Sequence, residues 1–322
     1  MKKSISLLFV FVIALSLLTS CFPSAADDTV IRIGVMSGPT GMGMAKLMHD
    51  NPEGSEKYEF SIYSAPTNAT ADLIGGTLDM LCLPTNTAAT LKNKNPDLLS
   101  VIAINTLGSL YLLTDANTSV ASVADLEGKT IYTSVASSTT VPIINHILKE
   151  NGVNATVEVE ADHQALVARI VQNNAEIAIL PEPMVTTALL QNSSYKVALN
   201  LSTEWKKISD QSLVMGCIVV RNDFIAEHKG LVNSFLKEYE ESIAYVSDST
   251  NLESAAQMIV DAGVLPKLPV AKKALANLKG SIVYLDGEAM KTALISFYQV
   301  LLDSMPASIG GALPNESFYY AP

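Results

Sequence analysis

The chain has 322 residues, of which 48% are hydrophobic and 16% are charged, and its formal net charge at pH 7 is −11. This length is enough for sizeable cores and predicts two lobes or domains. The acidic balance, without any basic run, argues against nucleic acid as a partner. The four histidines are scattered and no Cys-x-x-Cys spacing occurs, so we expect neither a metal site nor a cofactor.

Residues 1–20 have the pattern of a lipoprotein signal peptide. Two lysines follow the initial methionine, and the apolar run 7–18 is shorter than a membrane span. The run ends in Leu-Thr-Ser before Cys21, as in the bacterial lipobox, whose cysteine receives a lipid. We therefore expect a lipid on Cys21 and a tether over residues 21–28. A plain secretory signal is the alternative.

The stretch 31–48 predicts a strand, a turn of small residues and a helix. Apolar residues alternate over 31–35, and helical spacing begins at Met44. A turn of this kind exposes backbone N–H groups beside the positive end of a helix dipole. The hydroxyls of Ser37 and Thr40 lie in the same turn, so it could hold a carboxylate, a sulfonate or another acceptor. An ordinary turn between a strand and a helix gives the same pattern.

The pattern then alternates between strands and helices up to residue 199, which predicts largely parallel sheets covered by helices. A strand over 213–220 follows, and after it the chain is mainly helical. We expect strands over 60–63, 80–83, 101–105, 110–113, 131–134, 157–159, 177–180 and 195–199. We expect helices over 67–74, 143–150, 163–172, 184–190, 223–246, 252–262, 267–278 and 287–302, and another that starts at Pro84.

This order predicts two nested lobes. Lobe one would comprise residues 29–113 plus 218–322, and lobe two residues 114–217, with crossings near Thr114 and Gly216. Ligands of open α/β sheets bind outside the carboxyl ends of the strands, so the turns of both lobes would surround one cleft. Closure around a ligand would be a hinge motion at the crossings.

Two cysteines, Cys82 and Cys217, lie in apolar runs typical of strands. Cysteine is among the most buried residue types, so two buried thiols are expected. The sequence leaves a disulfide between them open.

Six segments together resemble the substrate-binding proteins of ABC importers, in the nitrate/sulfonate/taurine and thiamine-precursor group. They are GPTGMGMAKLM, GGTLDMLCLPTNTAA, NTLGSLYLLTD, ADLEGKTIY, LPEPMVTTAL and SIGGALPNESFYY, and the resemblance covers residues 29–322. It implies a two-lobed periplasmic-binding-protein fold of type II, with two crossovers and a ligand cleft between the lobes. It also implies a monomer that delivers a small molecule to a permease and ATPase complex. With the lipobox, it implies a protein on the outer face of the cytoplasmic membrane of a Gram-positive bacterium, held there through its lipid alone.

The resemblance implies ligand contacts in the turns that follow strands of both lobes. The corresponding residues here are Ser37, Gly38, Thr40, Gly41, Met42, Thr85, Asn86, Thr106, Ser137, Ser138, Thr139 and Glu182. Serine, threonine and asparagine are also common helix caps, so each has a purely structural alternative. The single tryptophan, Trp205, could stack on a ligand or lie partly buried in lobe two.

These turns contain no arginine or lysine, which argues weakly against an inorganic oxyanion. A carboxylate at Glu182 would favour a ligand with an amino or ring N–H group. We therefore expect a small neutral or zwitterionic organic ligand, such as an aminopyrimidine-like thiamine precursor or an aminosulfonate. No nucleophile and base can be paired from the sequence, so we do not expect an enzyme. The alternatives are an enzyme on the same fold, resembling thiamine-pyrimidine synthases or chorismate dehydratases, and a ligand-binding sensor.

Overall fold

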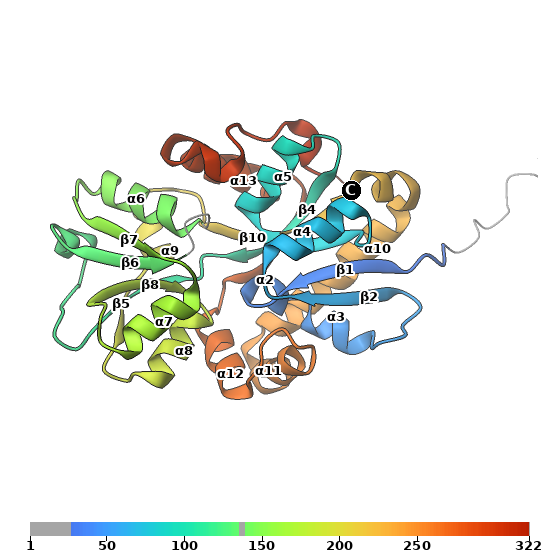
Figure 1. The fold of residues 1–322 in the computed structure, drawn as a ribbon. Coiled ribbons are helices and arrows are strands. Elements are labelled where there is room, and N and C mark those ends of the chain that lie inside the picture. Colours follow the sequence, from blue (N-terminus) through green and yellow to red (C-terminus); the bar gives the residue numbers. More distant parts are fainter. Residues whose placement is uncertain (1–26, 135–138, 322) are drawn as a thin grey trace, which may run out of the picture.

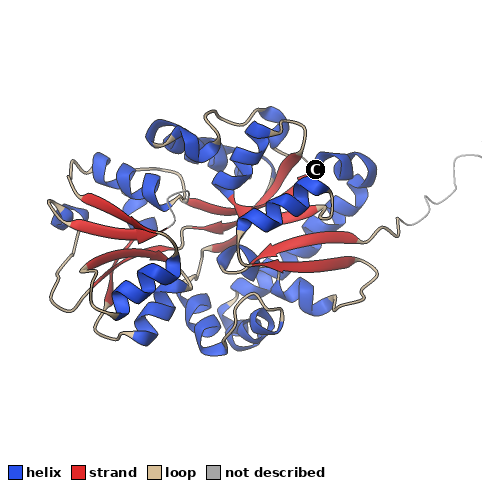
Figure 2. Cartoon of the chain, viewed as in Figure 1, coloured by secondary structure: helices blue, strands red, loops and turns tan. Residues whose placement is uncertain are grey.

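The structure, a computed structural model, describes residues 27–134 and 139–321 (Figure 1). The expected signal peptide, the lipid site at Cys21 and the candidate contacts Ser137 and Ser138 lie outside the described residues. Two α/β lobes lie side by side, each built on its own sheet (Figure 2). The described chain contains no helix that is both long and apolar enough to cross a membrane.

Lobe one is built on a six-stranded mixed sheet in the order β11-β4-β10-β3-β1-β2. Strands β2 and β3 pair parallel with β1, whereas β10 runs antiparallel to β3 and β4, and β11 runs antiparallel to β4. The strands are β1 (Ile31–Met36), β2 (Tyr58–Tyr63), β3 (Met80–Pro84), β4 (Leu99–Leu107), β10 (Val214–Arg221) and β11 (Ile282–Leu285).

Lobe two repeats this pattern in a five-stranded sheet with the order β7-β6-β8-β5-β9. Strands β7 and β8 pair parallel with β6, and β5 runs antiparallel to β8 and β9. Both sheets are therefore mixed, because each contains a crossing strand, β10 or β5, of opposite direction. The strands are β5 (Leu110–Thr114), β6 (Thr130–Ser134), β7 (Thr156–Glu160), β8 (Ile177–Pro181) and β9 (Lys196–Asn200).

Helices cover both sheets, and the long helices after β10 pack on lobe one (Figure 1). The helices of lobe one are α2 (Pro39–Met42), α3 (Ala45–Asp50), α4 (Pro66–Gly75), α5 (Thr85–Lys94), α10 (Asn222–Ser247), α11 (Leu252–Asp261), α12 (Leu268–Asn277) and α13 (Gly287–Ser304). Those of lobe two are α6 (Thr140–Glu150), α7 (His163–Val171), α8 (Met184–Gln191) and α9 (Leu201–Trp205). Short 3₁₀ turns are η1 (Val123–Leu126), η2 (Ser249–Asn251), η3 (Pro306–Ile309) and η4 (Glu316–Phe318).

The predicted two-lobed α/β fold is confirmed. Both segments in which the chain crosses between the lobes lie a few residues earlier than expected. The first crossing lies at residues 108–109, because all of β5 belongs to the sheet of lobe two. The return lies over 206–213, because β10 joins the sheet of lobe one from Val214 onward. Both crossing strands are continuous apolar runs, so their sequence does not reveal which sheet they join.

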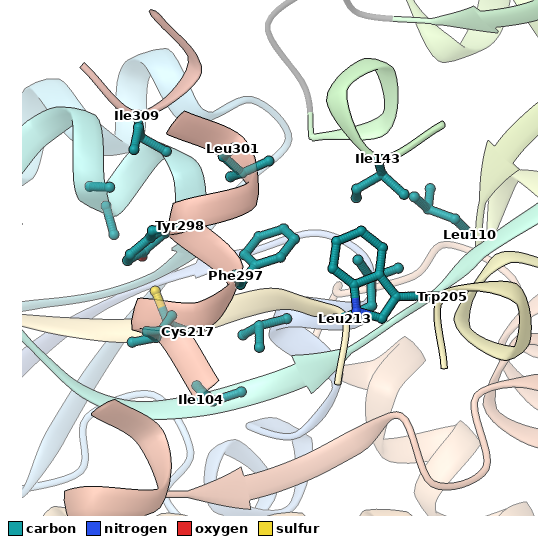
Figure 3. Close-up of a cluster of buried hydrophobic side chains, with 14 of the residues drawn as sticks. Ile104, Leu110, Ile143, Trp205, Leu213, Cys217, Phe297, Tyr298, Leu301 and Ile309 are labelled. Atoms are coloured by element: carbon teal, nitrogen blue, oxygen red, sulfur yellow. The ribbon is translucent and has the colours of Figure 1, made fainter. Parts of the chain in front are cut away.

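Trp205 lies in the hydrophobic core at the junction of the lobes (Figure 3). It is 1% exposed, and its ring centroid lies 6.0 Å from that of Phe297 on α13 and 5.2 Å from that of His146 on α6. Its indole N–H donates to the carbonyl of Gln211 at 3.0 Å. Trp205 therefore joins lobe two to α13 and offers no free ring face to a ligand.

Cys82 and Cys217 are both buried and free. They lie on neighbouring strands, but Cys82 is opposite Ile218 and Cys217 is opposite Leu83 in the antiparallel ladder. The two thiols belong to different apolar clusters, on opposite faces of the sheet. No disulfide joins them.

Candidate ligand-binding cleft

Three segments of lobe one meet around Gly216, near the start of β10. Gly216 lies between Pro84 of β3 and Thr106 of β4 in the ladder. A Cβ atom at this glycine would overlap the methyl group of Thr40 and would lie 2.6 Å from Oδ1 of Asn105 and 3.0 Å from Oγ1 of Thr106. Only glycine leaves room for α2 to pack this closely on the sheet.

The turn after β1 presents Thr40 toward this corner. Gly38 has a φ of 97°, which suits glycine, and its carbonyl accepts from the N–H groups of Gly41 and Met42. The hydroxyl of Thr40 has no hydrogen-bond partner among the described residues. The expected helix is present as α3, and the turn before it contains the additional helix α2. Because α2 has only four residues, the dipole of a long helix is missing from this turn.

The other candidates of the first turn differ in exposure. Ser37 is exposed, whereas Gly41 and Met42 are buried. A Cβ at Gly41 would overlap the carbonyl oxygen of Met36, and Met42 packs in the core of lobe one. Of the candidates in this turn, Thr40 is the one whose side chain lies against the corner at Gly216, and its contact with a ligand stays a prediction.

Asn105, which was not among the predicted contacts, forms hydrogen bonds to two residues of this corner. Its amide donates to the carbonyl of Thr40 at 3.1 Å, and its oxygen accepts from the hydroxyl of Thr106 at 3.0 Å. Both side chains are buried. The available signal was an asparagine inside the apolar run of β4, where a buried amide requires partners.

Thr85 and Asn86 bond within lobe one. The hydroxyl of Thr85 donates to the carbonyl of Val214 at 3.1 Å, and the amide of Asn86 donates to the carbonyl of Ser308 at 3.4 Å. Both residues are buried. Their hydrogen bonds connect the start of α5 to β10 and to η3. A direct contact of either residue with a ligand stays a prediction.

Lobe two contributes the carboxyl edge of its sheet. Ser134 ends β6, and its Oγ lies 2.6 Å from Nδ1 of His163, the first residue of α7. Burial lowers the pKa of His163, so its imidazole is neutral at pH 7. The hydroxyl of Thr139 donates to the sulfur of Met215 at 3.7 Å, which brings this edge against β10. His163 was missed in the sequence, where only its place after a strand could have indicated it.

Glu182 lies at the same edge, directly after β8, but it is only 1% exposed. Its carboxylate accepts from the N–H group of Thr186 at 3.2 Å, from the hydroxyl of Thr186 at 3.1 Å and from Nδ2 of Asn277 at 2.7 Å. A Cβ at Gly38 would lie 3.9 Å from Pro183. Glu182 thus lies beside the turn of lobe one that contains Gly38, and its carboxylate oxygens already accept hydrogen bonds from the protein.

The arrangement offers hydroxyl groups and one neutral imidazole from facing lobes. The described residues contain no cluster of three or more side chains that could hold a metal ion. The candidate residues of the two lobes thus present groups that can make hydrogen bonds.

Comparisons with known proteins agree with this architecture. The family model described as "NMT1/THI5 like" matches residues 59–250. No curated protein sequence matches the chain.

Several solved structures share the fold. An ABC transporter protein from Parabacteroides distasonis superposes with a TM-score of 0.77 at 20% identity, over 91% of this chain and 99% of that one. The aliphatic sulphonate binding protein SsuA from Escherichia coli gives 0.70 at 17% identity, over 91% and 92%. The nitrate-binding protein NrtA from Synechocystis PCC 6803 gives 0.63 at 13% identity, over 89% and 85%. The predicted resemblance to binding proteins of ABC importers is thereby confirmed at the level of the fold.

Proposed function

The chain belongs to the NMT1/THI5-like family, and from this premise we propose that it is a solute-binding protein that captures a small organic ligand between its lobes. It delivers this ligand to the permease and ATPase complex of an ABC importer. It acts as a monomer, anchored by a lipid on Cys21 to the outer face of the cytoplasmic membrane of a Gram-positive bacterium.

The observation that carries the proposal is the meeting of turns from both lobes. Thr40 and the corner at Gly216 belong to lobe one, and Ser134, His163 and Thr139 belong to lobe two. The two groups are joined where the hydroxyl of Thr139 donates to the sulfur of Met215, next to Gly216. A ligand held by both sets gains contacts only when the lobes are together, so its binding energy favours closure.

The ligand is a sulfonate or a heterocycle that resembles a thiamine precursor. The described turns present hydroxyls and a neutral imidazole rather than an arginine fork, which favours hydrogen bonding over ion pairing. Glu182 contributes less to this choice than its sequence position suggested, because its oxygens already accept three protein hydrogen bonds.

A thermal-shift screen tests the ligand class. The probes are taurine, methanesulfonate, an aminopyrimidine alcohol, nitrate and sulfate, each at several concentrations. A ligand at about 100 times its Kd adds roughly 2.7 kcal/mol to the stability of the folded state, which raises the melting temperature by about 5 °C. Stabilisation by nitrate or sulfate alone would contradict the proposed ligand class. If none of the five probes raised the melting temperature, the proposed ligand class would also be refuted.

An enzyme on the same fold is the second candidate, because the Ser134 hydroxyl lies 2.6 Å from an imidazole nitrogen. A hydroxyl beside a base is the usual arrangement of an activated nucleophile. The neutral imidazole of His163 lacks a carboxylate hydrogen bond among the described residues, so the third member of such a site is missing. Mass spectrometry of a bound probe after prolonged incubation decides between the two: a binding protein returns it unchanged.

A further inference from the structure

The segment that joins α12 to β11 bonds to the first crossing of the chain. The N–H group of Leu107 donates to the carbonyl of Ser281 at 2.7 Å, and the hydroxyl of Ser281 donates to the carbonyl of Gly108 at 2.8 Å. These bonds join lobe one to the segment at which the chain enters lobe two.

Asn277, four residues before Ser281, bonds directly to lobe two. Its backbone carbonyl accepts from the hydroxyl of Tyr111 on β5 at 2.8 Å. Its Nδ2 donates to Oε1 of Glu182 at 2.7 Å and, more weakly, to Oγ1 of Thr186 at 3.5 Å. Burial and the charge of Glu182 raise the pKa of Tyr111 to about 12, so the phenol keeps the proton that it donates. One residue of lobe one thus bonds to strand β5 and to the turn after β8 of lobe two.

A rotation of lobe two about residues 108–109 affects these bonds unequally. The bonds of Ser281 lie at the pivot and can persist, whereas all the bonds of Asn277 to lobe two reach beyond it. Asn277 is exposed, so water can replace its hydrogen bonds when the lobes separate.

The opposite edge of the junction is apolar. There α6 and Trp205 of lobe two pack against Phe297 on α13, and both aromatic rings are about 1% exposed. Exposing buried aromatic side chains to water is unfavourable, whereas water can replace the hydrogen bonds of Asn277. The edge between α8 and α12 is therefore the one that separates more easily.

We propose that Asn277 is an interlobe clasp, a positioning residue that holds the lobes together along the α8–α12 edge and thereby sets the proportion of closed molecules. The lobes open at this edge by rotation about residues 108–109, while the apolar edge between α6 and α13 stays packed. The consequence for ligand affinity rests on the proposed function: fewer closed molecules mean a higher apparent Kd.

Distance measurements between pairs of spin labels test the clasp in the unliganded protein. One pair, Leu190→Cys with Lys273→Cys, spans α8 and α12 at exposed positions. A second pair, Asn145→Cys with Gln299→Cys, spans α6 and α13. All labelled proteins also carry Cys21→Ser, so that no label attaches at position 21.

The other native cysteines, Cys82 and Cys217, are fully buried and do not compete for label. In this background Asn277→Ala removes the bond to Glu182. Asn277 is exposed, so water replaces part of the lost hydrogen bond, and we expect the ratio of open to closed molecules to rise about tenfold at the α8–α12 pair. The α6–α13 pair should keep its distance distribution.

Three further variants sharpen the result. Asn251→Ala is the matched control, because its amide donates to the carbonyl of Tyr245 within lobe one. It should change neither distribution. Asn277→Asp places a second carboxylate against Glu182 and should open the lobes further than alanine does. Tyr111→Phe removes the other bond and should open them partly.

The proposal is overturned if Asn277→Ala leaves the α8–α12 distances as they are in the parent, or if the α6–α13 pair opens instead. Circular dichroism melting curves identify any variant that fails to fold, and Tyr111→Phe then tests the same edge without a change at Asn277. Because the measurement needs no ligand, failure of the ligand screen leaves its outcome interpretable.

Discussion

Gly216→Ala offers the sharpest test of how the cleft is built. The new Cβ would overlap the methyl group of Thr40 and lie 2.6 Å from Oδ1 of Asn105, so that oxygen must retreat by roughly 1 Å to reach ordinary contact. Overpacking of this kind costs about 1–3 kcal/mol. Breaking the hydrogen bond from Asn105 to the carbonyl of Thr40 adds about 1 kcal/mol.

We therefore expect Gly216→Ala to lower the free energy of unfolding by about 2–4 kcal/mol, measured by urea denaturation. Gly230→Ala is the control, since nothing lies within 4 Å of a Cβ at that helical position. It should gain about 0.5–1 kcal/mol, because alanine favours helix over glycine.

A second substitution isolates the cause. Thr40→Ser removes the overlapping methyl group and keeps the hydroxyl, so in the Gly216→Ala background it should restore at least about 1 kcal/mol. The reasoning fails if Gly216→Ala is as stable as the parent, or if Thr40→Ser restores nothing in the double variant.

Three other predictions concern binding, pH and anchoring. Thr40→Val should weaken binding of the ligand found in the screen about 5- to 150-fold by calorimetry, because it leaves a ligand group unpaired; unchanged affinity would leave Thr40 a structural role only. The pKa of His163 is lowered in the folded state, so the unfolded state binds its proton first and stability should fall as the pH drops below about 6.5. His163→Asn should reduce that loss in melting curves from pH 7 to 5, and an identical pH profile would contradict it. Cys21→Ala should abolish lipid attachment in a bacterial host, whereas a parent chain that carries no lipid, by mass spectrometry, would refute the anchor.

Local pattern determined the elements of this protein. Apolar alternation and short turns of small residues predicted the strands and helices of both lobes, because each is fixed by contacts within a few residues. The predicted two-lobed α/β fold was confirmed. Strand β11 was missed: its four residues form an edge strand that is only partly buried, so it has no distinct apolar period.

The roles of the candidate residues depended on tertiary structure. A threonine in a turn has the same sequence pattern whether its side chain packs against a glycine, as at Thr40, or its hydroxyl donates to a backbone carbonyl, as at Thr85. Glu182 has three donors, one of which comes from Asn277, 95 residues away.

The pairing of Ser134 with His163 and the contact of Trp205 with Phe297 likewise join residues far apart in the chain. Which side chains meet is set by how the sheets and helices pack, and that packing depends on the whole chain rather than on any local stretch. The sequence alone therefore determined the turns from which a site could be built, and only the fold decided which of their side chains remain available to a ligand.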